Sequence, residues 1–276
     1  MQFPTSSQFS SHQITLNPSH FLLKSLLLHK AVMAISSGIY LLFLLNFFSF
    51  GAIFSSATSF TLENRCSFTV WPGSLTANGP PLGDGGFALA PGSSSRLQPP
   101  PGWSGRFWGR TGCNFDNSGS GKCVTGDCGG ALKCSGGGIP PVSLMEFTLN
   151  GHDNKDFYDI SLVDGYNMAV AVKAVGGTGT CQYAGCVNDL NKNCPTELQM
   201  MDSGSVVACK SACAAFNTPE YCCTGAHGTP QTCSPTKYSQ LFKNACPTAY
   251  SYAYDDATST MTCTGADYMI TFCPTS

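Results

Sequence analysis

The chain has 276 residues, of which 14 are Lys or Arg, 16 are Asp or Glu and 16 are Cys. Its formal net charge of −2 at pH 7 excludes a polycation that binds nucleic acid through the phosphates. Only 11% of the residues are charged, which excludes a long coiled coil, and the small net charge together with 42% hydrophobic residues excludes a disordered chain.

Residues 1–57 are predicted to be a secretory leader (signal peptide). Gly38–Phe54 is almost wholly apolar, Lys30 precedes it, and the small residues Ser55-Ser56-Ala57 follow it. This order is typical of a signal that is cleaved after Ala57, with Met33 as a second possible start. An uncleaved membrane anchor is the alternative, because the apolar run is close to the shortest length that spans a bilayer.

The next segments have the composition of short strands separated by turns. Alternating or β-branched and aromatic runs predict strands at Phe60–Glu63, Ser67–Trp71 (ended by Pro72-Gly73), Arg106–Arg110, Met145–Leu149, Phe157–Val163 and Tyr166–Val172. Residues 112–141 are Gly-rich and hold four cysteines, so this segment can bury little and needs disulfides.

The segment 181–246 has the clearest helical patterns. Val206, Cys209, Cys213 and Phe216 have the spacing of one helix face, which predicts a helix capped by Asp202 or Ser203. Pro235 is expected at the first position of a second helix, with Tyr238, Leu241, Phe242 and Ala245 turned inward.

Strand patterns return at the end of the chain. Tyr250, Tyr252 and Tyr254 alternate with other residues, and Tyr268, Ile270 and Phe272 do the same. The predicted fold is therefore mainly β, with a largely antiparallel core and two smaller disulfide-rich insertions, one of them partly helical.

All sixteen cysteines lie after the leader, and their even number in an oxidising compartment predicts eight disulfides. The spacing alone leaves the connectivity open. No Cys-x-x-Cys occurs, and only His152 and His227 remain after the leader, so we expect neither a metal site nor a cofactor. A paired sulfur also cannot serve as a thiolate nucleophile.

Carboxylates are the remaining candidates for chemistry, because no Gly-x-Ser-x-Gly elbow, phosphate loop or dinucleotide fingerprint is present. Glu146 lies on the polar face of a predicted strand, Asp164-Gly165 is a hairpin-turn dipeptide, and Asp255-Asp256 follows the tyrosine run. Each alone is more typical of a solvated face or a turn than of a functional site. Carboxylates gathered near aromatic rings, however, are typical of a groove that binds or cleaves sugars.

Several longer motifs resemble one family. Gly119–Cys134 (GSGKCVTGDCGGALKC) resembles the signature of the thaumatin-like proteins, pathogenesis-related family 5, and so do Asp156–Gly165, Glu220–Cys223 and Thr271–Pro274. The resemblance covers residues 58–276. It implies a β-sandwich core with two smaller disulfide-rich lobes, divided as follows: sandwich core 58–111, 142–187 and 247–276, Gly/Cys-rich lobe 112–141, and helical disulfide-rich lobe 188–246.

The same resemblance implies a disulfide pairing and an acidic cleft. The pairs would be Cys66–Cys273, Cys113–Cys123, Cys128–Cys134, Cys181–Cys263, Cys186–Cys246, Cys194–Cys209, Cys213–Cys222 and Cys223–Cys233. Antifungal members line the cleft with an Arg-Glu-Asp-Asp-Asp set, which Arg106, Glu146, Asp159, Asp164 and Asp256 match in full.

These matches imply a secreted, plant-type defence protein of the apoplast or cell wall that binds β-1,3-glucan or a related fungal wall polysaccharide in the acidic cleft. Two alternatives stay open: a weak endo-β-1,3-glucanase that uses Glu146 and Asp164, and an inhibitor of foreign hydrolases. We expect a monomer whose partner is the polysaccharide, with no nucleic acid, no stable membrane anchor and no cofactor.

Overall fold

The computed structural model describes residues 58–275. The predicted leader, residues 1–57, lies outside this range. Within it, no helix is long and apolar enough to cross a membrane.

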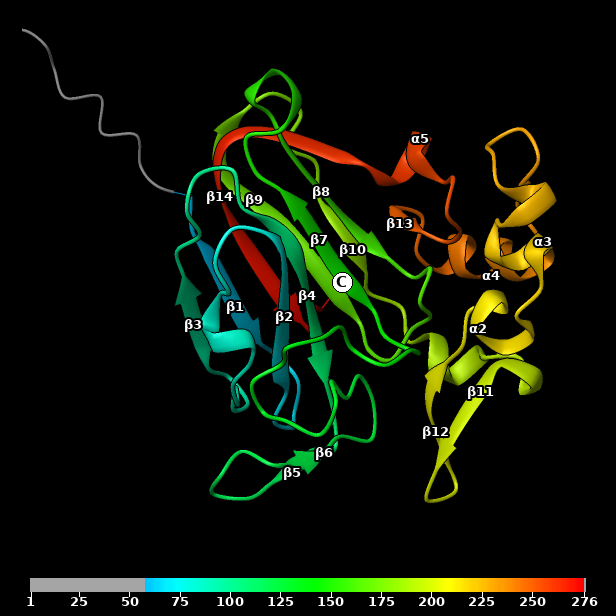
Figure 1. Ribbon diagram of the computed structural model, residues 1–276, viewed down its shortest axis with the longest axis horizontal. Coiled ribbons are helices and arrows are strands. Elements are labelled where there is room, and N and C mark those ends of the chain that lie inside the picture. Colours follow the sequence, from blue (N-terminus) through cyan, green and yellow to red (C-terminus); the bar gives the residue numbers. More distant parts are fainter. Residues whose placement is uncertain (1–57, 276) are drawn as a thin grey trace, which may run out of the picture. The chain divides into compact units, whose positions relative to one another are not determined.

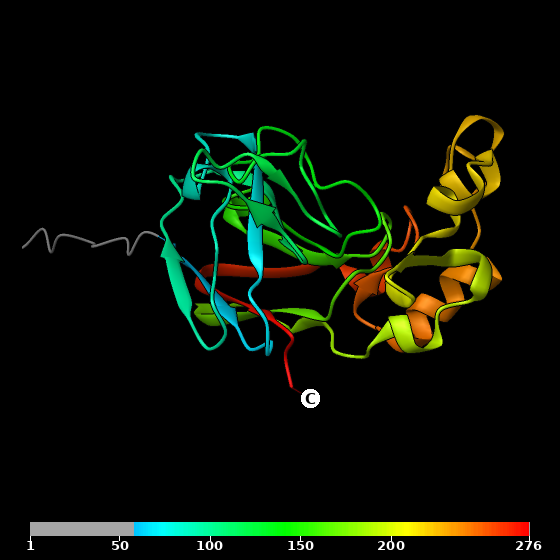
Figure 2. The same ribbon diagram turned by 90° about the horizontal axis from the view of Figure 1, so that it is seen from below.

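A ten-stranded sheet curls into two layers (Figures 1 and 2). The first layer consists, in spatial order, of β2 (Trp71–Asn78), β4 (Ser104–Arg110), β7 (Leu144–Thr148) and β8 (Asp156–Ser161), with the short β13 (Ala249–Tyr250) beside β8. The second layer consists of β3 (Ser94–Leu97), β1 (Phe60–Asn64), β14 (Met261–Phe272), β9 (Val170–Thr178) and β10 (Ala184–Cys186).

Strand β14, red in Figure 1, joins the two layers. Its first residues, Met261–Cys263, pair with β8, and the rest of the strand pairs with β9 and β1. The prediction of a mainly β fold is confirmed. Most pairs are antiparallel as expected, but β1 runs parallel to β14, and β13 runs parallel to β8.

The core between the layers is built from aromatic rings. The ring of Phe60, on β1, lies 4.7–5.4 Å from the rings of Trp103, Phe107 and Phe147 and 6.0 Å from that of Tyr268. All five side chains are at least 97% buried. Each such pair adds about 0.5–1.5 kcal/mol beyond its burial, so this cluster holds the two layers together.

The expected end of a strand at Pro72-Gly73 is wrong, because both residues lie inside β2. β2 is the last strand of its layer, where a proline without an N–H group breaks no ladder. Gly73 is required by a close approach, since a Cβ there would lie 2.4 Å from the Trp108 ring.

The Gly-rich segment 112–141 has little regular structure, only β5 (Asn114–Phe115) and β6 (Gly121–Lys122). Arg110, at the end of β4, fastens it to the sheet. The fully buried guanidinium donates to the carbonyl oxygens of Ala131 and Leu132 at 2.9 and 2.7 Å, and to that of Trp71 on β2 at 2.9 Å. Burial lowers the pKa of Arg110 to about 10.

The segment 188–246, yellow to orange in Figure 1, holds one hairpin and three α-helices. They are β11 (Gln199–Asp202), β12 (Ser205–Cys209), α2 (Ala212–Phe216), α3 (Pro219–Cys222) and α4 (Lys237–Ala245). A fourth α-helix, α5 (Asp256–Ser259), precedes β14. Short 3₁₀ turns lie at Gly83–Gly85, His152–Asn154, Leu190–Asn193, Thr196–Leu198 and Gly225–His227.

The predicted helix through Val206, Cys209, Cys213 and Phe216 is only half right, because residues 205–209 form a strand. Ser203 and Gly204 have φ values of 48° and 83°, which make the tight turn of a hairpin and stop a helix from forming there. The helix starts later, where the Ser211 side chain accepts from the Ala214 N–H. The second predicted helix is α4, but it begins at Lys237 with Thr236 as its cap, two residues after Pro235.

Eight disulfides join all sixteen cysteines. Their partners are the same as in the pairing that the family resemblance implies. Two staple the Gly-rich segment, and three lie wholly within the segment 188–246. Both segments contain few buried apolar residues, so these bonds supply stability that burial does not.

Candidate functional site: an acidic groove

Three neighbouring strands of the first layer, β4, β7 and β8, position three charged side chains of the site. Arg106 on β4 lies opposite Glu146 on β7, and Glu146 lies opposite Asp159 on β8. Their strand neighbours Phe107, Phe147 and Tyr158 are buried in the core, so the three charged side chains share the outer face.

Asp164 and Asp256 reach the same place from outside the strands. Asp164 lies in the turn after β8, and Asp256 begins α5. All five residues of the predicted set line one open groove of about 390 Å³, together with Leu144, Ser161, Val163, Tyr250 and Ala253. The Tyr250 hydroxyl donates to Asp256 Oδ1 at 2.8 Å and so fixes that carboxylate at the rim.

The groove continues over the outer face of the sheet. A second hollow of about 210 Å³ shares Arg106, Glu146 and Asp159 with the first. It extends the line to Thr148 and to the half-buried ring of Phe157, which face each other on β7 and β8. An elongated ligand could therefore contact the carboxylates and an aromatic ring at the same time.

One arginine faces four carboxylates in the groove, and burial is the main cause of the pKa shifts of Glu146, Asp159 and Asp164. Arg106 Nε lies 3.8 Å from Glu146 Oε1. Burial raises the pKa of Glu146, Arg106 opposes this, and Asp164 adds to it. Burial also raises the pKa of Asp164, again against the effect of Arg106.

Asp159 is the most perturbed carboxyl group of the set. Its Oδ1 atom is buried and has no hydrogen-bond partner among residues 58–275. Burial, together with the negative charges of Glu146 and Asp256, raises its pKa to about 8. Asp159 is therefore neutral in mildly acidic solution, and it can donate a hydrogen bond.

The groove offers hydrogen bonds, a cation and aromatic rings, and no group of three potential metal ligands occurs in the part of the chain that the structure describes. The thaumatin family model matches residues 64–274. The chain belongs to the thaumatin family.

Relatives of known name support this assignment. Pathogenesis-related protein 5 of Arabidopsis thaliana is 64% identical over 242 residues, which cover 88% of this chain and 100% of that protein. A Prunus avium protein named glucan endo-1,3-beta-glucosidase is 52% identical over 235 residues, which cover 83% of this chain and 95% of that protein. A solved thaumatin-like xylanase inhibitor is 25% identical, with a TM-score of 0.43, and the match covers 78% of this chain and 99% of that one. The family model and the Arabidopsis thaliana relative confirm the resemblance to thaumatin-like proteins of pathogenesis-related family 5.

The predicted strand through Tyr250, Tyr252 and Tyr254 is wrong in this thaumatin-family chain, because the strand ends at Tyr250. The three tyrosines do not share one face. The Tyr254 hydroxyl donates to the Gly228 carbonyl oxygen at 2.7 Å, whereas Tyr250 faces the groove. The role of Tyr250 was missed because an alternating tyrosine pattern is also typical of a strand.

A half-buried ion pair that the sequence did not reveal supports α5. Lys243 Nζ, on α4, lies 3.0 Å from Asp255 Oδ2 and donates to the Ala249 carbonyl oxygen and the Ser259 hydroxyl at 3.0 and 2.9 Å. Asp255 directly precedes Asp256, so this ion pair ties the part of the chain that carries the groove residue Asp256 to α4. No local motif pairs a lysine with an aspartate at this separation.

Replacing Asp159 by Asn should change how stability depends on pH. Below its ordinary pKa of 3.8 Asp159 is protonated in both the folded and the unfolded chain. As pH rises, the unfolded chain ionises while the folded chain holds the proton up to about pH 8, so the wild type loses stability across this window. Asp159→Asn should match the wild type near about pH 4 and exceed its free energy of unfolding by up to about 5 kcal/mol near about pH 9, because each unit of pKa shift corresponds to about 1.4 kcal/mol.

Urea unfolding with the disulfides intact, repeated across this pH range, measures the difference. Asp202→Asn on the exposed β11–β12 hairpin is the control for the loss of one negative charge. A difference for Asp159→Asn that stays constant with pH would show that its carboxyl group is not neutral in the folded protein.

Proposed function

We propose that this protein is a secreted plant-type defence protein that binds β-1,3-glucan, or a related fungal wall polysaccharide, in the acidic groove. The observation that carries the proposal is the convergence of Arg106, Glu146, Asp159, Asp164 and Asp256 on one open groove. Carboxylates and the arginine can accept from and donate to sugar hydroxyls, and the rings of Phe157 and Tyr250 offer flat faces to a sugar.

Secretion is part of this proposal. The predicted leader and the absence of free cysteines among residues 58–275 both suit an oxidising compartment outside the cell. The family relation to Pathogenesis-related protein 5 supports a defence role. The protein would act as a monomer, since the groove is built from one chain.

Binding should depend on Asp164 more than on a carboxylate outside the groove. Asp164→Asn removes a charged acceptor of sugar hydroxyls and should weaken binding about five- to tenfold. Asp202→Asn, the control, removes the same charge from an exposed hairpin and should have no effect on binding. The measurement is a binding isotherm from co-sedimentation with insoluble linear β-1,3-glucan.

Two results would contradict the proposal. Equal effects of Asp164→Asn and Asp202→Asn would mean that net charge, rather than the groove, governs binding. Failure of the wild type to bind the glucan more strongly than cellulose would remove the proposed ligand.

A weak endo-β-1,3-glucanase is the second candidate function. It is favoured by the Prunus avium relative whose name is glucan endo-1,3-beta-glucosidase. Glu146 would act as the acid, because it lies on a regular strand, is partly exposed and has a raised pKa. Asp164, in the turn, would act as the base or nucleophile.

A further inference from the structure

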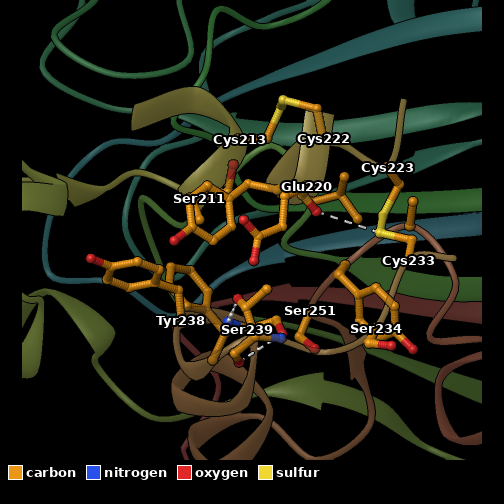
Figure 3. A pocket seen from close by; sticks show the side chains of 17 residues that line it. Ser211, Cys213, Glu220, Cys222, Cys223, Cys233, Ser234, Tyr238, Ser239 and Ser251 are labelled. Atoms are coloured by element: carbon orange, nitrogen blue, oxygen red, sulfur yellow. Dashed lines mark hydrogen bonds between the residues drawn. A yellow bond between two sulfur atoms is a disulfide. The ribbon is translucent and has the colours of Figure 1, made fainter. Parts of the chain in front are cut away.

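Another pocket, distinct from the two hollows described above, borders the acidic groove on the side of the segment 188–246. It is lined by α2, α3, α4 and the residues between β13 and α5, and has a volume of about 50 Å³. Figure 3 shows the side chain of Glu220, on α3, directed into it. Arg106, Glu146, Asp159, Asp164 and Asp256, the five charged residues of the acidic groove, do not line this pocket.

Part of the polar lining has no partner. The hydroxyls of Ser211, Ser239 and Ser251 are used inside the protein, as helix caps or in a hydrogen bond to Asp255. By contrast, four side chains of the pocket make no hydrogen bond to any residue in 58–275: Glu220, Tyr221, Ser234 and Tyr252. The pocket therefore presents a carboxylate and three hydroxyls that can bind a ligand.

The wall that carries these groups is rigid. The disulfides Cys213–Cys222 and Cys223–Cys233 fix the C-terminal end of α3, and Figure 3 shows both at the pocket. The ring of Tyr221 packs 5.4 Å from that of Phe216 and 5.7 Å from that of Tyr238. A preformed pocket loses little conformational entropy when it binds a ligand.

The pocket and the acidic groove share two lining residues, Val163 and Ala253. A chain that lies in the groove and continues past these residues would reach the pocket. The volume of the pocket suits the hydroxymethyl arm of a hexose or a few water molecules, so the sugar ring would lie at the mouth, beside Tyr221 and Tyr252.

We propose that this pocket is an additional subsite for the polysaccharide, which binds one neutral hexose unit beyond those in the acidic groove. Glu220 and Ser234 hydrogen-bond its hydroxyls, and the tyrosine rings contact its apolar face. The inference rests on the proposed function and adds a length requirement: the full affinity needs an oligosaccharide long enough to span both sites.

Calorimetric titration with linear β-1,3-glucan oligosaccharides, from the disaccharide upward, tests this requirement. The wild type should gain affinity with each unit until the subsite is filled. Glu220→Gln should bind the short members like the wild type and the long members about five- to tenfold more weakly, the loss expected for one charge-assisted hydrogen bond. Ser234→Ala should show the same pattern with a smaller loss.

Asp202→Asn is the matched control, because it removes one charge from the same helical segment and lies outside the pocket. Glu220 is exposed, so its substitution leaves folding intact. If Glu220→Gln equals Asp202→Asn at every length, the subsite is absent although the groove binds glucan. If the wild type binds no member of the series, the proposed function itself is wrong.

Discussion

Arg110→Met should lower the free energy of unfolding by about 3–5 kcal/mol, because each buried carbonyl oxygen left without a donor costs about 1–3 kcal/mol. The guanidinium is completely buried. It donates to the carbonyl oxygen of Trp71 on β2 and to those of Ala131 and Leu132 in the Gly-rich segment. Methionine fills much of the same volume but donates nothing. Arg110→Lys should recover only part of the loss, since one ammonium group cannot reach carbonyl oxygens on both sides.

Guanidinium chloride unfolding with the disulfides intact measures this effect, and limited proteolysis locates it. Cleavage should increase within residues 112–141, because Arg110 fastens this segment to the sheet. Arg96→Met is the control: Arg96 is exposed, and its ion pair with Asp267 at 3.7 Å should contribute less than about 1 kcal/mol. Equal losses for both variants would show that the buried hydrogen bonds do not hold the segment.

Glu146→Gln should reduce any glucan cleavage by about two to four orders of magnitude, the range typical of losing a general acid. The amide keeps the shape and an acceptor oxygen but cannot donate an acidic proton. Most of the glucan binding should therefore remain. The raised pKa of Glu146 is consistent with this role, because more of the side chain stays protonated in mildly acidic solution.

The assay is the release of reducing ends from purified linear β-1,3-glucan, with binding to the insoluble polymer measured in parallel. Asp202→Asn should retain the wild-type rate. If the wild type and Glu146→Gln release the same trace of reducing sugar, the activity comes from a contaminant. The binding function would then stand without catalysis.

The strands of the sandwich could be predicted from the sequence because their alternation is strong. Phe60 and Leu62, for example, are buried on one face of β1, as their spacing requires. The segment 203–216 was harder, because cysteines and valines count as apolar in both helical and strand patterns. Residues 205–209 form a strand because Ser203-Gly204 makes a turn and Cys209 pairs with Tyr166. The pairing involves a residue far away in the sequence, so no local pattern could predict it.

For the site, the family resemblance allowed us to predict which residues belong to it, but not how they are arranged in space. Which strand lies beside which is decided by the packing of the whole sheet, and this register brings Arg106, Glu146 and Asp159 together. Asp256 reaches the groove from a short helix, although the tyrosine pattern suggested a strand. The ion pair of Lys243 with Asp255 has no sequence signature, because two elements must first pack for it to form.

The disulfide between Cys66 and Cys273 has a consequence for the fate of a cleaved molecule. The two cysteines are 207 residues apart, so the bond closes nearly the whole described chain into one covalent ring. A protease that cuts a single exposed loop anywhere inside this ring produces two pieces that stay joined. A wall or fluid rich in hydrolases would then contain nicked molecules of unchanged mass, apart from one added water, with the sheet that carries the groove still in place. Only a reducing agent, or cuts at several places, would release fragments.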